Sequence, residues 1–179
     1  MNMQTIIFKF KTHYKINSII LKLKVKMIKK ISGLSPEEQN WLVKAVVSII
    51  VSDGQVEEKQ IKFLKMVFKG YLENEPHETL TEIARLLKSK TIPNLEKLQV
   101  NDLERLIFIL NILSASVFTN GKKLKSEVNQ YFEAGKKLGL EVGSLSYRLS
   151  LEAERERIKR KLSDVRKDIG DFLNISWFL

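Results

Sequence analysis

Cysteine is absent from the 179 residues, and histidine and proline are scarce. Without cysteine the chain forms neither disulfides nor thiolate metal sites, so it carries no signal of an oxidising compartment. We therefore expect a cytoplasmic location. The two histidines, His13 and His77, lie far apart and lack the spacing of a catalytic triad or a zinc site. Glycine-rich phosphate loops are also missing, which predicts a protein that is not an enzyme and has no resident cofactor.

Long apolar runs are absent as well. The longest candidates, Trp41–Val51 and Leu106–Phe118, are interrupted by Lys44 and Asn111. Both are shorter than the roughly 18 to 20 residues that span a bilayer. The N-terminus shows neither the apolar segment nor the cleavage site of a secretory signal. Because 44% of the residues are hydrophobic, we expect these runs to be core helices of a soluble domain.

Positive charge is concentrated at the N-terminus. The chain carries a net charge of +10, of which residues 1–26 contribute six lysines and no acid, leaving +4 on the rest. We predict that residues 1–30 form a basic, disordered extension. Two other interpretations stay open: an arm for phosphates or lipid headgroups, and translated upstream sequence with the native start at Met27.

The first helix has a strong start signal. Ser35 can cap free amides, Pro36 suits the first helical position, and Glu38 completes a capping box. The helix is apolar on nearly every side and ends at Asp53-Gly54, so we place it at the centre of a bundle. An amphipathic helix from about Glu57 and another from Pro76 follow, and the segment 91–94 ends the second of these.

The pattern then returns. Another apolar helix runs from Asp102 to Asn120-Gly121, and an amphipathic helix follows it and ends at Gly139. The two turns are 67 residues apart, which indicates an internal duplication. We predict an all-α helical bundle built from two pseudo-repeated helix–turn–helix hairpins, followed by a charged C-terminal helix. In this bundle the helices Trp41–Val51 and Leu103–Phe118 contact each other at the centre, related by a rough two-fold.

These turns resemble those of the TerB-like (tellurite-resistance) family, an all-helical fold of two such hairpins. There each turn reads Asp-Gly, an apolar residue, then an acid six residues after the glycine. The first turn here keeps Asp53 and Gly54 but has Gln60 at the later place, whereas the second keeps Gly121 and Glu127 but has Asn120. The resemblance covers residues 34–145 and implies a TerB-like domain over residues 31–145.

The resemblance implies a non-enzymatic binding or scaffold module in an envelope- or metal-stress system. Its partner would be a protein, which one interpretation places at a membrane. It also implies that Asp53, Glu57 and Glu127 offer oxygen ligands to a hard cation. The missing acids predict at most millimolar affinity for a divalent cation. The simpler interpretation is that Asp-Gly and Asn-Gly only supply a left-handed backbone at a helix end.

From residue 146 to residue 179 the chain becomes highly charged, with predicted helical ion pairs Glu152–Arg155 and Glu156–Arg160. An apolar stripe with coiled-coil spacing runs along this helix. Its members are Leu151, Ile158, Leu162, Val165, Ile169 and Phe172. We favour packing of the stripe against the chain's own bundle. The alternative is an interaction surface for a partner or for a homo-oligomer.

A rival function belongs to another class. Residues 1–30 and the basic part of the last helix would bind nucleic acid or an anionic membrane, with an affinity that falls steeply with salt. Deleting residues 1–26 would abolish that binding. We expect nucleic acid to be the less favoured partner, because the body of the protein is only mildly basic.

Overall fold

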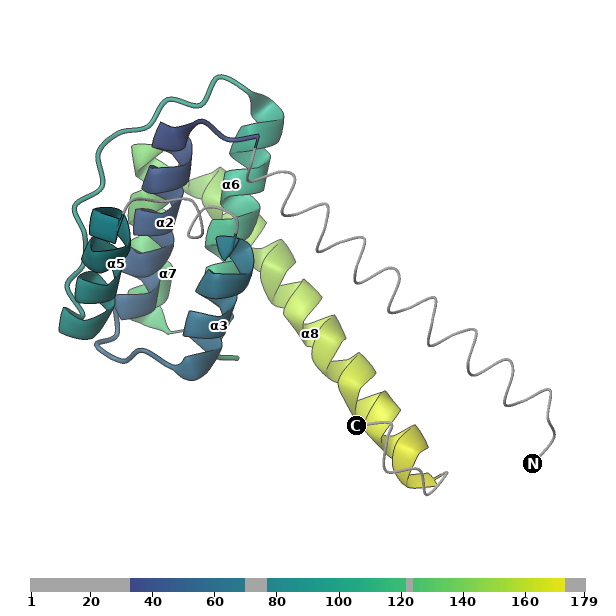
Figure 1. The fold of residues 1–179 in the computed structure, drawn as a ribbon. Coiled ribbons are helices and arrows are strands. Elements are labelled where there is room, and N and C mark those ends of the chain that lie inside the picture. The colour runs from purple at the N-terminus through teal and green to yellow at the C-terminus, as the bar shows by residue number, and fades with distance from the viewer. Residues whose placement is uncertain (1–32, 70–76, 122–123, 173–179) are drawn as a thin grey trace.

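A computed structural model describes residues 33–69, 77–121 and 124–172, so the expected basic extension lies outside the described residues. Over these ranges the chain is helical and contains no strand, which confirms the all-α prediction (Figure 1). The helices are α2 (Pro36–Val51), α3 (Glu58–Val67), α5 (His77–Ser89), α6 (Leu103–Ser116), α7 (Lys125–Lys137) and α8 (Val142–Phe172).

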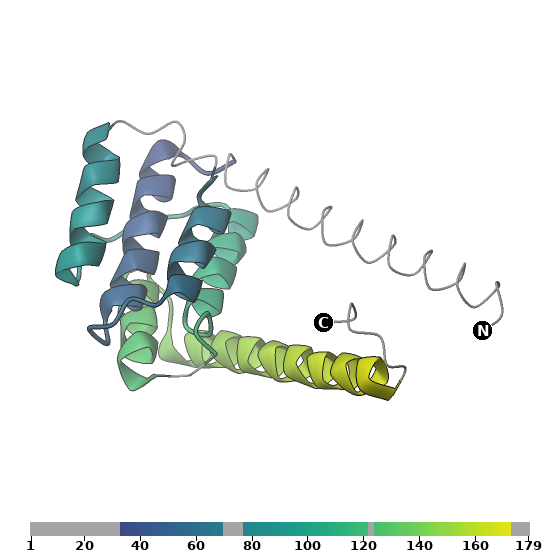
Figure 2. The same ribbon diagram turned by 60° about the horizontal axis from the view of Figure 1, so that its bottom comes forward.

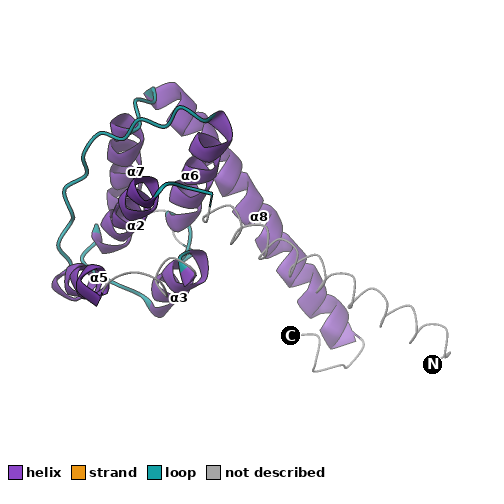
Figure 3. Cartoon of the chain, turned by 45° about the horizontal axis from the view of Figure 1, so that its top comes forward, coloured by secondary structure: helices purple, strands orange, loops and turns teal. Residues whose placement is uncertain are grey.

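Helix α2 lies at the centre of the bundle. Its predicted start is confirmed, since the Ser35 hydroxyl accepts the Glu38 amide at 3.1 Å and the Glu38 carboxylate accepts the Ser35 amide at 2.7 Å. From Trp41 to Val51 every side chain except Lys44 is buried. Helices α3, α5, α6 and α7 surround it, as the view in Figure 3 shows. This position explains why α2 is apolar on nearly every side.

The predicted contact between α2 and α6 is confirmed. Asp102 caps α6 by accepting the Arg105 amide at 2.8 Å. The expectation that α6 is buried on all sides is wrong, because Leu103 is 69% exposed and Ile107 is 48% exposed. Unlike α2, α6 buries only the face that meets its neighbours.

A non-helical strap, residues 91–102, connects α5 to α6 across the outside of the bundle (Figure 1). Leu95 and Leu98 of the strap are buried. The Trp41 indole Nε1 donates to the Glu96 carbonyl at 2.8 Å, and the Leu98 amide donates to the Lys137 carbonyl at 3.0 Å. The strap is therefore fixed to both α2 and α7.

Helix α8 packs against α6 and α7 and then extends past the bundle as a rod (Figure 2). Leu145, Leu149 and Glu152 are buried, so the bundle includes the first part of α8 and the predicted boundary at residue 145 lies inside this helix. Residues 157–168 are all exposed. No helix among the described residues combines the length and the apolarity needed to cross a bilayer.

The apolar stripe of α8 does not pack against the bundle. Leu151, Ile158, Leu162 and Val165 are between 44% and 54% exposed, so the bundle does not cover this face of α8. The side chains of Ile169 and Phe172 lie outside the described residues. The favoured expectation is thus corrected for the four described members, which form an open seam.

The charged pairs of α8 are only partly as predicted. The Glu152–Arg155 pair is confirmed at 3.3 Å. The Glu156–Arg160 pair is wrong, because Glu156 pairs with Lys159 and Arg160 donates to the Gly121 carbonyl at 2.6 Å. A free backbone carbonyl at the end of a turn is a good acceptor for a guanidinium, and α8 passes close to that turn.

Candidate functional site

The two turns that follow α2 and α6 have the same backbone form. Gly54 has φ 73° and Gly121 has φ 78°, both in the left-handed region. The Gly54 amide donates to the Val51 carbonyl at 3.0 Å, and the Gly121 amide donates to the Phe118 carbonyl at 3.0 Å. The interpretation of Asp-Gly and Asn-Gly as turn formers is confirmed in this respect.

Between these turns lies a buried carboxyl group. Glu127, in the first turn of α7, is fully buried. Its Oε1 accepts the side-chain amide of Gln60 at 3.0 Å and that of Asn120 at 3.3 Å. Gln60 is held in place because its own Oε1 accepts the Glu57 amide at 2.8 Å. Among the described residues Glu127 Oε2 has no hydrogen-bond partner.

The pKa of Glu127 is raised to about 7, mainly by burial and in addition by the charges of Asp53 and Glu57. Hydrogen bonds from the Leu124 backbone and from Gln60 act in the opposite direction. The amides lower the pKa by solvating the charged form, but they carry no net charge to offset the loss of water. Glu127 therefore exchanges its proton near neutral pH.

Asp53, Glu57 and Glu127 do not come together as a group that could hold a metal ion. No group of three histidine or acidic side chains that could hold a metal ion occurs within residues 33–69, 77–121 and 124–172. Asp53 instead accepts the Gln55 amide at 2.9 Å in its own turn.

The side-chain amides of Gln60 and Asn120 point their N–H groups at Glu127, where a cation would need oxygens. From the sequence alone, Gln60 counts as a missing acid, and Asn120 counts as a missing acid or as a turn former. Their side-chain amides could have indicated the hydrogen bonds to Glu127, because an amide N–H can donate to a carboxylate, whereas a second carboxylate would repel it.

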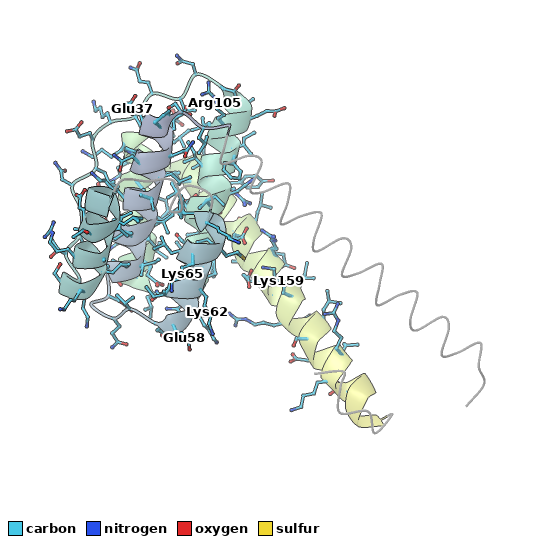
Figure 4. All side chains as sticks on the ribbon, in the orientation of Figure 1. Glu37, Glu58, Lys62, Lys65, Arg105 and Lys159 are labelled. Carbon is cyan, nitrogen blue, oxygen red and sulfur yellow. The ribbon has the colours of Figure 1, made fainter. Side chains whose placement is uncertain are left out.

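A groove lies between α3, α6 and α8, with a volume of about 630 Å³. Its apolar lining comprises Phe63, Met66, Phe108, Ile112, Ala115 and Phe118. Its charged lining comprises Lys59, Lys62, Arg148, Arg155, Lys159, Glu152 and Glu156. Figure 4 labels Lys62 on α3 and Lys159 on α8, which come from opposite walls. The sequence did not predict this groove.

Cations exceed acids around the groove. Buried Glu152 accepts from Arg148 at 3.1 Å and from Arg155 at 3.3 Å, so one carboxylate serves two guanidinium groups. Lys62 pairs with exposed Glu58 at 2.7 Å. Because exposed pairs are weak, such lysines can exchange partners at little cost. The groove thus combines apolar surface with a positive field.

A smaller cavity of about 350 Å³ continues from the groove along α8. Phe118 and Glu156 line both spaces. Its other lining residues are Gly121, Ala153, Arg157, Arg160 and Lys161. The positive surface therefore extends from α3 toward the exposed part of α8.

Comparison of the chain with known protein families, curated proteins and solved structures found no match. The function must therefore be inferred from two features of the structure. One is the groove, and the other is the Glu127 cluster, which consists of Glu127, Gln60 and Asn120.

Proposed function

We propose that this chain is a non-enzymatic protein-binding module. The observation that carries the proposal is the groove, where six apolar side chains from α3, α6 and the turn after α6 line a space of about 630 Å³. Small domains cover most of their apolar surface, and a contiguous open patch inside a concave surface is typical of a binding site. The charged residues around it would provide orientation and selectivity.

The proposal includes the TerB-like type of fold. Two contacts support it, because each joins residues 67 positions apart, the offset between the two turns. Gln60 donates to Glu127 at 3.0 Å, and Arg105 donates to Glu38 at 3.1 Å. Residues related by a two-fold axis meet each other when they lie near the axis. Two repeated hairpins about a rough two-fold would produce such pairs.

The role that we propose is the one that a TerB-like fold implies, a scaffold in an envelope- or metal-stress system. The protein would act in the cytoplasm and would bind a protein partner, which one interpretation places at a membrane. The Glu127 cluster favours structure over metal storage, since amides occupy Oε1. We therefore propose that no cofactor is needed and that affinity for divalent cations is weak.

A second surface favours self-association. The open seam of α8, formed by Leu151, Ile158, Leu162 and Val165, presents apolar side chains with coiled-coil spacing on a helix that solvent surrounds. A second copy of the chain could cover it helix to helix. This surface is separate from the groove residues and is tested separately below.

The alternative function is binding of nucleic acid or of an anionic membrane by the basic N-terminal arm and α8. Arg160 and Lys161 beside the smaller cavity favour it, although the acids of α8 neutralise much of that charge. Its signature is affinity for polyanions that falls steeply with salt and disappears on deletion of residues 1–26.

The test is affinity purification of the tagged full chain from its native cell after nuclease treatment. We compare the wild type with Met66→Asp in the groove and with Ile107→Asp, an exposed apolar residue of α6 that does not line the groove. The proposal expects a protein partner that the Met66 variant alone fails to retain. Recovery of the same proteins by all three chains, or of nuclease-sensitive material only, would overturn it.

A further inference from the structure

The apolar lining of the groove is elongated. Phe108, Ile112 and Ala115 are spaced four and three residues apart along α6, so they form a stripe that follows the helix axis for about 10 Å. Phe63 and Met66 of α3 border this stripe on one side, and α8 borders it on the other. A space enclosed by three helices with an axial apolar stripe suits a short helix that presents one apolar face.

The charges lie on both walls. Lys59 and Lys62 belong to α3, whereas Arg155 and Lys159 belong to α8 (Figure 4). With Arg148 the lining holds five cations, against the two acids Glu152 and Glu156. A helix in the groove would place both flanks of its apolar face against positive walls. Acidic flanks would be attracted, and basic flanks would be repelled.

We propose that the groove binds an acidic amphipathic helix, one with an apolar face flanked on both sides by Glu or Asp. This inference rests on the proposed protein-binding function and specifies its partner. Nucleic acid fits less well, because phosphates would leave the accessible apolar lining, Phe63, Met66 and Ala115, uncovered and would meet Glu152 and Glu156. Exposed Met66 adds a deformable contact that tolerates different apolar side chains.

The test uses three fluorescently labelled peptides of about 15 residues and the full chain, followed by fluorescence anisotropy. The first peptide carries leucines at positions i, i+3, i+4 and i+7 with glutamates on both flanks. The second has lysines in place of the glutamates, and the third has serines in place of the leucines. We expect the acidic peptide to bind at least tenfold more tightly than the other two.

Variants of the chain locate the binding. Lys62→Glu and Lys159→Glu should each weaken the acidic peptide about tenfold. The matched control is Lys65→Glu, an exposed lysine of α3 that does not line the groove and should change affinity less than twofold at physiological salt. Met66→Asp should abolish binding, and Ile107→Asp should not. Circular dichroism establishes that each variant is folded, and all five changes are at residues with solvent-exposed side chains.

Equal binding of the acidic and basic peptides, or equal effects of the Lys62 and Lys65 changes, would overturn the inference. The inference would also be overturned if a double-stranded oligonucleotide or phosphatidylserine vesicles bound in the groove and displaced the acidic peptide. Loss of that binding in the Met66→Asp variant would show that it depends on the groove. If unlabelled full chain displaced the acidic peptide, and the Met66→Asp chain did not, the groove would instead be assigned to a second copy of the chain. If a cellular partner depends on the groove but the acidic peptide fails, the proposed function stands and this inference falls.

Discussion

At the scale of single residues, the buried carboxyl of Glu127 is the least expected feature of the chain. A buried acid is usually stabilised by a cation or a metal, yet its hydrogen-bond donors are the neutral side-chain amides of Gln60 and Asn120. These donors reduce the penalty of burial without removing it. The proton of Glu127 is therefore linked to the stability of the fold.

This linkage predicts a pH dependence. The pKa of Glu127 is about 7 in the folded protein and 4.5 ordinarily, so the folded state keeps the proton longer than the unfolded state. The stabilising contribution is full below about pH 4.5 and is lost as the pH rises to about 7. At about 1.4 kcal/mol for each pKa unit, we expect the wild type to lose about 1 to 3 kcal/mol between pH 5 and pH 8 through this group.

Urea unfolding at several pH values measures how the free energy of unfolding depends on pH. The test variant is Glu127→Gln. This variant should flatten the profile and should be the more stable chain at pH 8. Glu133→Gln, an exposed acid on the same helix, should keep the wild-type profile. If Glu127→Gln followed the same curve as the wild type, Glu127 would not titrate as described.

Some hydrogen bonds of single residues could be predicted from the sequence, and others could not. The Ser35–Glu38 capping box was predictable because both partners lie within one helical turn. The bond from Gln60 to Glu127 crosses 67 positions, and a search for acids alone treats Gln60 as a loss. Local hydrogen bonds can be read from spacing, whereas a distant amide pair needs the fold.

At the scale of helices, α7 and α8 pack closely where α7 has no side chain. Gly135 is buried, and a Cβ built on it would overlap both methyl groups of Leu145. Nearby, the Tyr131 hydroxyl donates to the Leu145 carbonyl at 3.2 Å. The contact between these helices therefore depends on a glycine at this position.

We expect Gly135→Ala to destabilise the protein by about 1 to 3 kcal/mol, because the added carbon would lie 2.4 Å from both methyl groups of Leu145, a fully buried side chain that would have to shift within the core. The control is Gly143→Ala in α8, where nothing lies within 4 Å of the added carbon. That change should be neutral or stabilising by up to about 1 kcal/mol through helix propensity. Thermal unfolding of both variants measures these changes in stability. A Gly135→Ala variant as stable as the wild type would contradict the close packing of α7 and α8.

The open seam of α8 predicts concentration-dependent association. We expect sedimentation equilibrium of the wild type to show a dimer at high protein concentration, and Leu162→Asp to shift it back to monomer without changing thermal stability. Leu103→Asp serves as the control, since Leu103 is a leucine on α6 that is even more exposed than Leu162. A wild type that stays monomeric at all concentrations would rule out self-association through the seam.

Helix positions were largely predictable from the sequence, and their surroundings were not. Over the described residues, most helices begin and end close to the predicted signals, because caps and glycines act locally. Apolar spacing gives the residues that share a face, as it did for the stripe of α8. It does not reveal what covers that face, so the exposure of Ile107 and of the α8 seam came only from the structure.

At the scale of the whole molecule, burial falls from the centre outward. Helix α2 is enclosed by four other helices, whereas residues 157–168 of α8 are exposed on all sides (Figures 2 and 3). An isolated helix of this length is only marginally stable in water. Local opening should therefore cost much less in the outer part of α8 than in α2.

Hydrogen exchange measures this gradient. We expect amides of residues 157–168 to exchange fastest among the described helices and those of α2 to exchange slowest, near the rate of global unfolding. Dilute protein is required, since covering of the seam by a second copy would protect α8. Equal protection of α2 and of residues 157–168 in the monomer would contradict the exposed rod.

The central place of α2 has a consequence for biosynthesis. α2 leaves the ribosome early, yet α6 and α7, which enclose it, are translated much later. At about 5 to 20 residues per second the interval is on the order of ten seconds. During that time α2, the most buried of the described helices, has only α3 and α5 as neighbours. Nascent chains that end before α7 should therefore bind chaperones or aggregate, and release should coincide with the emergence of residue 137.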